Sequence, residues 1–104
     1  MILLALNELN LDYIRGYIGQ GKLTHFGKLL ENGVFNTTSE EKYELLEPWI
    51  QWATVQTGKA YDEHRVFRLG DMVERPDLQQ IFEELEKSGL SVGAISPFNA
   101  DNRL

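Results

Sequence analysis

The chain has 104 residues, of which 42% are hydrophobic and 25% charged, which fits one ordinary globular domain and excludes a disordered chain. The formal net charge is −6 with no basic run, which disfavours binding to a nucleic-acid backbone or an anionic membrane surface. Cysteines are absent, which excludes disulfides, thiolate metal sites and cysteine nucleophiles and is compatible with a cytoplasmic location.

The chain opens with a short apolar run that is typical of a buried strand. Residues Ile2 to Leu6 are continuously hydrophobic, as expected of a strand covered on both faces in a parallel sheet. The run is too short for a membrane span and lacks the features of a signal peptide. A helix is predicted after it, with Asn10 as N-cap, Ile14 on the apolar face and an end near Gly19.

Two further helices are predicted in the middle of the chain. The first has Thr24 as its N-cap and Gly33 as a left-handed stop. Residues 34–46 then read as extended chain or loop. Pro48 opens the next helix, because its fixed φ and missing N–H suit the first helical position, and Gly58 is expected to end it.

The last third of the sequence predicts a helix followed by a second strand. Pro76 is expected at the first helical position and Gly89 at the end, with an apolar stripe between them. Residues Leu90 to Ser96 then form a second buried strand. Strands at both ends with helices between them predict an α/β fold, in which a parallel-sheet βαβ core carries flanking helices.

Ligands of open α/β sheets bind beyond the carboxyl ends of the strands. Two such ends are predicted here, at residues 7–10 and at residues 96–102. Both are rich in amides and carboxylates, which suit a polar ligand or a hard metal ion. The alternative is that these asparagines and aspartates only cap helices and form turns.

The stretch Glu47 to His64, EPWIQWATVQTGKAYDEH, offers a third candidate surface. The free N–H groups of a helix that begins at Pro48 point beyond Glu47 and favour an anion. No Gly-rich phosphate loop, G-x-S-x-G elbow or H-E-x-x-H motif is present in the chain. The candidate substrate-binding residues are Trp49 and Gln51 of this stretch and Asn99 of the last loop.

Taken in order, these segments resemble the N-terminal part of the alkaline phosphatase superfamily, and most closely its type I phosphodiesterase and nucleotide pyrophosphatase branch. The motifs that carry the resemblance are LLALNELNLDYI, the helix end LLENG, and the spacing of Trp52, Thr57, Gly58 and His64. With this resemblance, residues 1–104 are expected to be either a single α/β domain or the N-terminal part of a longer, alkaline-phosphatase-like α/β/α domain. The resemblance also implies divalent Zn, Mn or Mg ions and a phosphate or sulfate ester as substrate.

The chain departs from the family pattern at its two most important positions. Pro48 stands where the family has its nucleophilic hydroxyl, and a proline cannot attack phosphorus. Asn7 stands where the family has a metal-binding aspartate, and Glu8 replaces the glycine after it. The resemblance therefore gives Asn7 and Glu8 as the metal candidates, and Glu47 and Thr54 as the catalytic candidates in place of the missing hydroxyl.

Two functions follow from this interpretation. The first is the N-terminal part of a metal-dependent phosphoester or sulfoester hydrolase or transferase with altered catalytic residues, inactive as an isolated chain. The alternative is a non-catalytic binding or scaffold module that keeps the superfamily fold and binds a sugar, a nucleotide or a partner protein. A domain without any site is the remaining possibility.

Overall fold

The structure, a computed structural model, describes residues 2–101 and divides into two compact units, one up to Thr38 and one from Ser39 onward. Helices account for 44% of the described residues, which form no strand. The predicted α/β fold with a parallel-sheet βαβ core is therefore wrong. All regular secondary structure of the described residues is helical.

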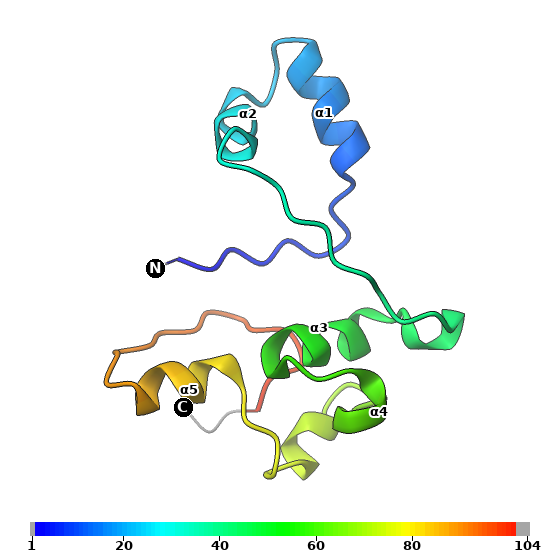
Figure 1. Ribbon diagram of the computed structural model, residues 1–104, viewed down its shortest axis with the longest axis vertical. Coiled ribbons are helices and arrows are strands. Elements are labelled where there is room, and N and C mark those ends of the chain that lie inside the picture. The colour runs from blue at the N-terminus through cyan, green and yellow to red at the C-terminus, as the bar shows by residue number, and fades with distance from the viewer. Residues whose placement is uncertain (1, 102–104) are drawn as a thin grey trace. The chain divides into compact units, whose positions relative to one another are not determined.

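The first unit contains two helices that pack against each other, α1 (Leu11–Gly19) and α2 (Thr24–Leu30) (Figure 1). Asn10 caps α1 as predicted, since its Oδ1 accepts the N–H groups of Asp12 and Tyr13 at 3.0 and 3.1 Å. The predicted N-cap of α2 is off by one residue. Thr24 is already helical, and the preceding Leu23 occupies the N-cap position with a left-handed backbone at φ 51°.

The second unit is built from three α-helices and two short 3₁₀ turns (Figure 1). In chain order these are η1 (Tyr43–Leu45), α3 (Pro48–Thr57), α4 (Tyr61–His64), η2 (Asp71–Glu74) and α5 (Ile81–Lys87). Helix α3 contacts both α4 and α5, so it is the central element of this unit.

Helix α3 begins and ends where the sequence predicts. Pro48 is its first residue, and Gly58 closes it with a left-handed backbone at φ 67°, a conformation that a glycine adopts at little cost. The Gly58 N–H bonds to the carbonyl of Thr54 at 2.8 Å. Local proline and glycine signals therefore fix both ends of this helix.

A small apolar core holds the second unit together. Its cluster joins α3 to the chain that follows α4 and consists of Ala53, Val66, Met72 and Leu78. Ile50, one turn before Ala53 on α3, is also completely buried. Because these side chains come from four separate segments, their burial links parts of the unit that are distant in sequence.

The two predicted strands do not form. Residues 2–6 and 90–96 have no strand or helix assignment and end in turns or bends. Most of their apolar side chains are exposed, with Ile2 at 94% and Ile95 at 95% of their accessible surface, and none is buried. An apolar run shows that a segment favours burial, but a strand also needs a neighbouring strand to pair its backbone groups, and the described residues offer none.

The helix predicted from Pro76 begins five residues later, at Ile81. Arg75 to Leu78 instead form a turn, in which the Leu78 N–H bonds to the Arg75 carbonyl at 3.0 Å. This turn brings Leu78 into the core, where only 2% of its surface stays exposed. Tertiary burial of one leucine thus overrides the helix-start signal of the proline. The predicted end is confirmed, since Gly89 follows the helix with φ 82°.

Candidate functional site

Glu47 occupies the N-cap position of α3 and stands exposed at the start of the helix. Its backbone is extended, and its carbonyl accepts the N–H groups of Ile50 and Gln51 at 2.9 and 3.0 Å. Its side chain makes no capping hydrogen bond to the helix. The carboxylate therefore lies next to the positive end of the helix dipole and forms no hydrogen bond with the first turn of the helix.

Thr54 and His64 join α3 to α4. The Thr54 hydroxyl lies 3.1 Å from His64 Nε2, and His64 is completely buried. A hydroxyl and an imidazole at this distance satisfy the geometry of a nucleophile and its general base. Which atom donates the proton decides whether the pair can do that chemistry.

The other ring nitrogen of His64 settles the direction of this hydrogen bond. The Val66 backbone N–H donates to His64 Nδ1 at 2.9 Å, so Nδ1 carries no proton. A neutral imidazole then carries its proton on Nε2 and donates it to the Thr54 hydroxyl. In this tautomer His64 cannot accept the hydroxyl proton of Thr54. A catalytic role for Thr54 stays a prediction and requires the opposite tautomer.

Burial keeps His64 neutral. Desolvation is the main reason why the pKa of His64 lies below its ordinary value of 6.5, and the charge of Arg75 lowers it further, whereas Glu40 and Glu63 act in the opposite direction. Protonation of Nδ1 would also remove the acceptor of the Val66 N–H. The neutral ring is therefore part of the folded structure.

Arg75 braces the end of α4 from outside. Its Nη1 donates to the His64 carbonyl, while its Nε and Nη2 donate to the two carboxylate oxygens of Asp77 at 2.8 and 2.6 Å. This bidentate pair orients the guanidinium, and the hydrogen bonding of Arg75 to the Asp77 carboxylate raises the pKa of Arg75. His64 is thus held at both its ring and its backbone.

The amide residues predicted to bind substrate form internal hydrogen bonds instead. Asn99 is buried, its Nδ2 donates to the Trp49 carbonyl at 2.7 Å, and its Oδ1 accepts the Gly70 N–H at 2.9 Å. Gln51 Nε2 donates to the Leu45 carbonyl at 2.7 Å. The structure brings Asn99 to the backbone of Trp49, and a substrate-binding role for these residues stays a prediction. Asn102, at the end of the same predicted loop site, lies outside the described residues.

Removing the Asn99 amide should destabilise the second unit. We expect Asn99→Gly, which retains the left-handed backbone at φ 46°, to lower the free energy of unfolding by about 1–3 kcal/mol, because the Gly70 N–H and the Trp49 carbonyl both lose their hydrogen-bond partner. Urea unfolding of the full chain measures this loss. Asn36→Gly in the exposed loop is the control, and an equal effect of both substitutions would contradict the structural role of Asn99.

The metal candidates Asn7 and Glu8 lie in an exposed turn of the first unit. Glu8 has a left-handed backbone at φ 56°. The catalytic candidate Glu47 belongs to the second unit, so the two candidate carboxylates lie in different units. Among residues 2–101, no three His, Cys, Asp or Glu side chains gather closely enough to hold a metal ion. One amide and one carboxylate fall short of the four to six ligands that Zn²⁺ or Mg²⁺ requires, so the described donor set does not fit a metal by itself.

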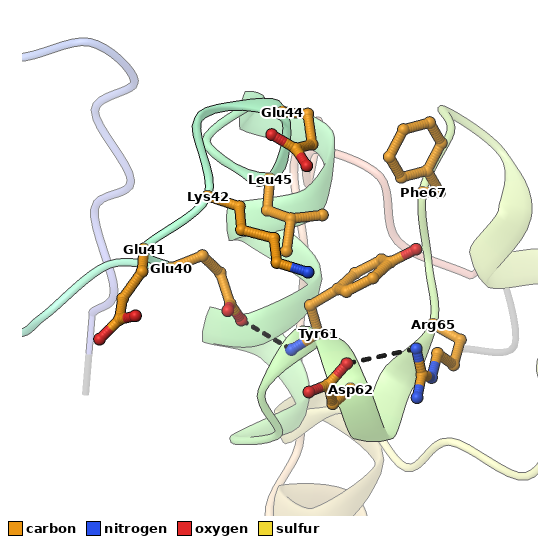
Figure 2. A pocket seen from close by; sticks show the side chains of 9 residues that line it. All are labelled: Glu40, Glu41, Lys42, Glu44, Leu45, Tyr61, Asp62, Arg65 and Phe67. Carbon is orange, nitrogen blue, oxygen red and sulfur yellow. Dashed lines mark hydrogen bonds and ion pairs between the residues drawn. The ribbon is translucent and has the colours of Figure 1, made fainter.

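The structure shows a cavity that the sequence did not reveal. It has a volume of about 420 Å³ and lies between the segment before α3 and the segment from α4 onward, both in the second unit (Figure 2). Its lining consists of Glu40, Glu41, Lys42, Glu44, Leu45, Tyr61, Asp62, Arg65 and Phe67. The acidic run EEKYE was the available signal, but a loop sequence does not show which aromatic side chains it will face.

Comparison with known proteins gives no relative of this chain: no family model, no curated protein and no solved structure matches it. Among the residues that the structure describes, no helix combines the length and the apolar character needed to cross a membrane. A function for the chain therefore has to be argued from its own residues.

Proposed function

We propose that this chain is the N-terminal part of a metal-dependent phosphoester or sulfoester hydrolase or transferase with altered catalytic residues. The observation that carries the proposal is the α3–α4 unit. The motif residues Thr57 and Gly58 end α3, and His64, six residues after Gly58, folds back onto it. The residues whose spacing resembles the phosphodiesterase branch therefore lie on two helices, α3 and α4, that contact each other.

In this proposal Glu47 is the reactive group, and helices α3 and α4 position it. His64 has a structural role, because its two ring nitrogens form hydrogen bonds with Thr54 and with the Val66 backbone. Glu47 is exposed at the helix start, next to the proline that replaces the family hydroxyl. A carboxylate there can orient a water molecule and accept its proton, which a proline cannot do.

The divalent metal implied by the resemblance needs ligands beyond those that the described residues gather. Asn7 and Glu8 would contribute at most one carboxylate and one amide oxygen. We therefore expect metal-dependent activity of the full-length protein only, and no turnover by residues 1–104 alone.

The test is hydrolysis of a nitrophenyl phosphodiester and a nitrophenyl sulfate by the natural gene product with Zn²⁺, Mn²⁺ or Mg²⁺. We expect metal-dependent turnover that Glu47→Gln lowers about 100-fold or more, as is usual when a general base is lost. Glu86→Gln, an exposed change on α5, is the matched control and should leave the rate unchanged. Absence of metal-dependent turnover with every ester class would reject the proposal.

A binding module without catalysis is the second candidate function, and the cavity in the second unit is the observation that favours it. The cavity combines charged side chains with the aromatic rings of Tyr61 and Phe67. Small-molecule sites commonly combine a concave surface with a few placed polar groups. A thermal-shift screen of the chain with metals, anions and organic cations separates the candidates, since only the binding module predicts stabilisation by a ligand without turnover.

A further inference from the structure

The backbone of Glu47 is restricted on one side by the proline that follows it. A residue before a proline is kept out of the helical region by a clash with the proline ring, and Glu47 has the extended backbone expected there, at φ −63° and ψ 139°. Its carboxylate forms no capping hydrogen bond with α3 and no ion pair with any of the described residues. The position of this carboxylate therefore depends on the position of the Glu47 backbone.

Gln51 fixes the chain on the other side of Glu47. The Gln51 backbone N–H donates to the Glu47 carbonyl at 3.0 Å, and the Gln51 side chain donates through Nε2 to the Leu45 carbonyl at 2.7 Å. One residue thus binds the carbonyl of Glu47 and the carbonyl two positions before it. Leu45 is buried, so the side-chain bond connects the first turn of α3 to a residue that is anchored in the fold.

We infer that Gln51 is a positioning residue for the Glu47 carboxylate. While Gln51 binds the Leu45 carbonyl, the backbone leading into Glu47 cannot shift, and only rotations about the side-chain bonds of Glu47 move its carboxylate. A general base has to stay within hydrogen-bond reach of the proton that it accepts, and a misplacement of about 1 Å can cost about 100-fold in rate. The inference deepens the hydrolase proposal and rests on it.

Gln51→Met removes the hydrogen-bond donor and keeps a side chain of similar length and helix propensity. In the natural gene product with added metal and the nitrophenyl ester, we expect this change to lower kcat about tenfold and to alter KM by no more than about twofold, because the geometry of the reaction is lost and not the binding of the substrate. Gln20→Met, exposed in the first unit, is the matched control and should leave both constants unchanged. A raised KM with an unchanged kcat would indicate direct substrate contact by Gln51 and overturn the positioning role.

A double-mutant cycle with Glu47→Gln separates positioning from a general effect on the fold. If Gln51 acts through the Glu47 carboxylate, Gln51→Met should lower kcat by no more than about twofold once that carboxylate has been removed, since residues that act as a unit are not additive. An equal tenfold loss in both backgrounds would leave Gln51 only a structural role.

Amide hydrogen exchange tests the Gln51 hydrogen bond without turnover. The N–H groups of Leu45 and Leu46 each bond to the carbonyl three residues earlier, at 2.9 and 3.1 Å. In the full 104-residue chain, Gln51→Met should raise the exchange rates of these two amides about five- to tenfold, as expected for the loss of one hydrogen bond that stabilises the segment. Unchanged exchange rates would show that Gln51 does not fix this segment, and would overturn the inference.

The outcomes separate this inference from the hydrolase proposal on which it rests. A full rate in Gln51→Met, beside a loss of about 100-fold in Glu47→Gln, overturns the positioning role and retains Glu47 as the base. A loss of rate in Gln51→Met that is absent from Glu47→Gln supports both. Absence of metal-dependent turnover in the unmodified protein overturns both.

Discussion

Met72→Ala should lower the free energy of unfolding by about 2–5 kcal/mol, the usual cost of emptying a buried position of this size. Met72 is completely buried and shares its cluster with Ala53, Val66 and Leu78. It comes from η2, whereas Ala53 belongs to α3, so its truncation leaves a void between segments that are distant in sequence.

The neighbouring residue provides a matched control for this measurement. Val73 lies in the same 3₁₀ turn but exposes 62% of its surface, so Val73→Ala should change stability by no more than about 0.5 kcal/mol. Both tryptophans of the chain lie on α3, so their fluorescence during urea unfolding reports on the second unit. Equal midpoints for the two variants would show that Met72 is not in a packed core.

His64→Ala should cost about 2–4 kcal/mol, because the truncation leaves a cavity and strands a buried backbone N–H. The imidazole links Thr54 on α3 to the backbone of Val66, and Val66 is itself a core residue. The loss therefore loosens the α3–α4 connection and the core together. Urea unfolding of the full chain followed by tryptophan fluorescence measures the effect.

The same residue makes the stability of the chain depend on pH. The folded pKa of His64 is depressed below its ordinary value of 6.5, mainly by burial, so between the two values the unfolded chain binds more protons than the folded chain. The stabilising contribution is therefore fully present above pH 6.5 and is lost as the pH falls toward the folded pKa. Glu40 and Glu63, which favour protonation, narrow this window, and Arg75 widens it.

The second histidine of the chain is the control for this pH effect. His25 is exposed in the first unit, so His25→Ala should retain the acid-dependent loss of stability, whereas His64→Ala should remove the part due to imidazole protonation. The comparison uses unfolding curves between pH 5 and pH 7.5, the range in which histidine ordinarily titrates. An unchanged pH profile in His64→Ala would assign the effect to other groups.

Local signals in the sequence predict both ends of α1 and of α3. Asn10 caps α1, Pro48 begins α3 and Gly58 ends it, because each of these residues acts through its own backbone or through a partner within three residues. Pro76 fails as a helix start for the opposite reason. The burial of Leu78, a contact with distant segments, decides the conformation there.

Features that depend on distant partners could not be predicted from the sequence. The apolar runs at residues 2–6 and 90–96 predicted strands, but pairing requires a neighbour that a local pattern does not identify. The cavity was missed for the same reason, because its two walls come from residues 40–45 and 61–67. The sequence predicts features that depend on residues close in the chain, but it does not predict contacts between distant segments.

The sequence predicts where the helix of the candidate site begins, but not the contacts of the other candidate residues. The helix that begins at Pro48 places Glu47 at its exposed start, whereas no local pattern predicts the hydrogen bond from Asn99 to the Trp49 carbonyl. The tie between Thr54 and His64 was missed, although both residues stood in the stretch that the sequence singled out. A separation of ten residues across a glycine stop gives no periodic signal that would pair them.

The most direct test of the structural role of His64 locates the proton on its ring, because that ring donates to Thr54 and links α3 to α4. Long-range ¹H–¹⁵N correlation NMR at pH 7.5 locates that proton. We expect a neutral ring with its proton on Nε2 and an unprotonated Nδ1 that accepts the Val66 N–H. A proton on Nδ1, with Nε2 free to accept from the Thr54 hydroxyl, would contradict this role and make the pair a hydroxyl and its base.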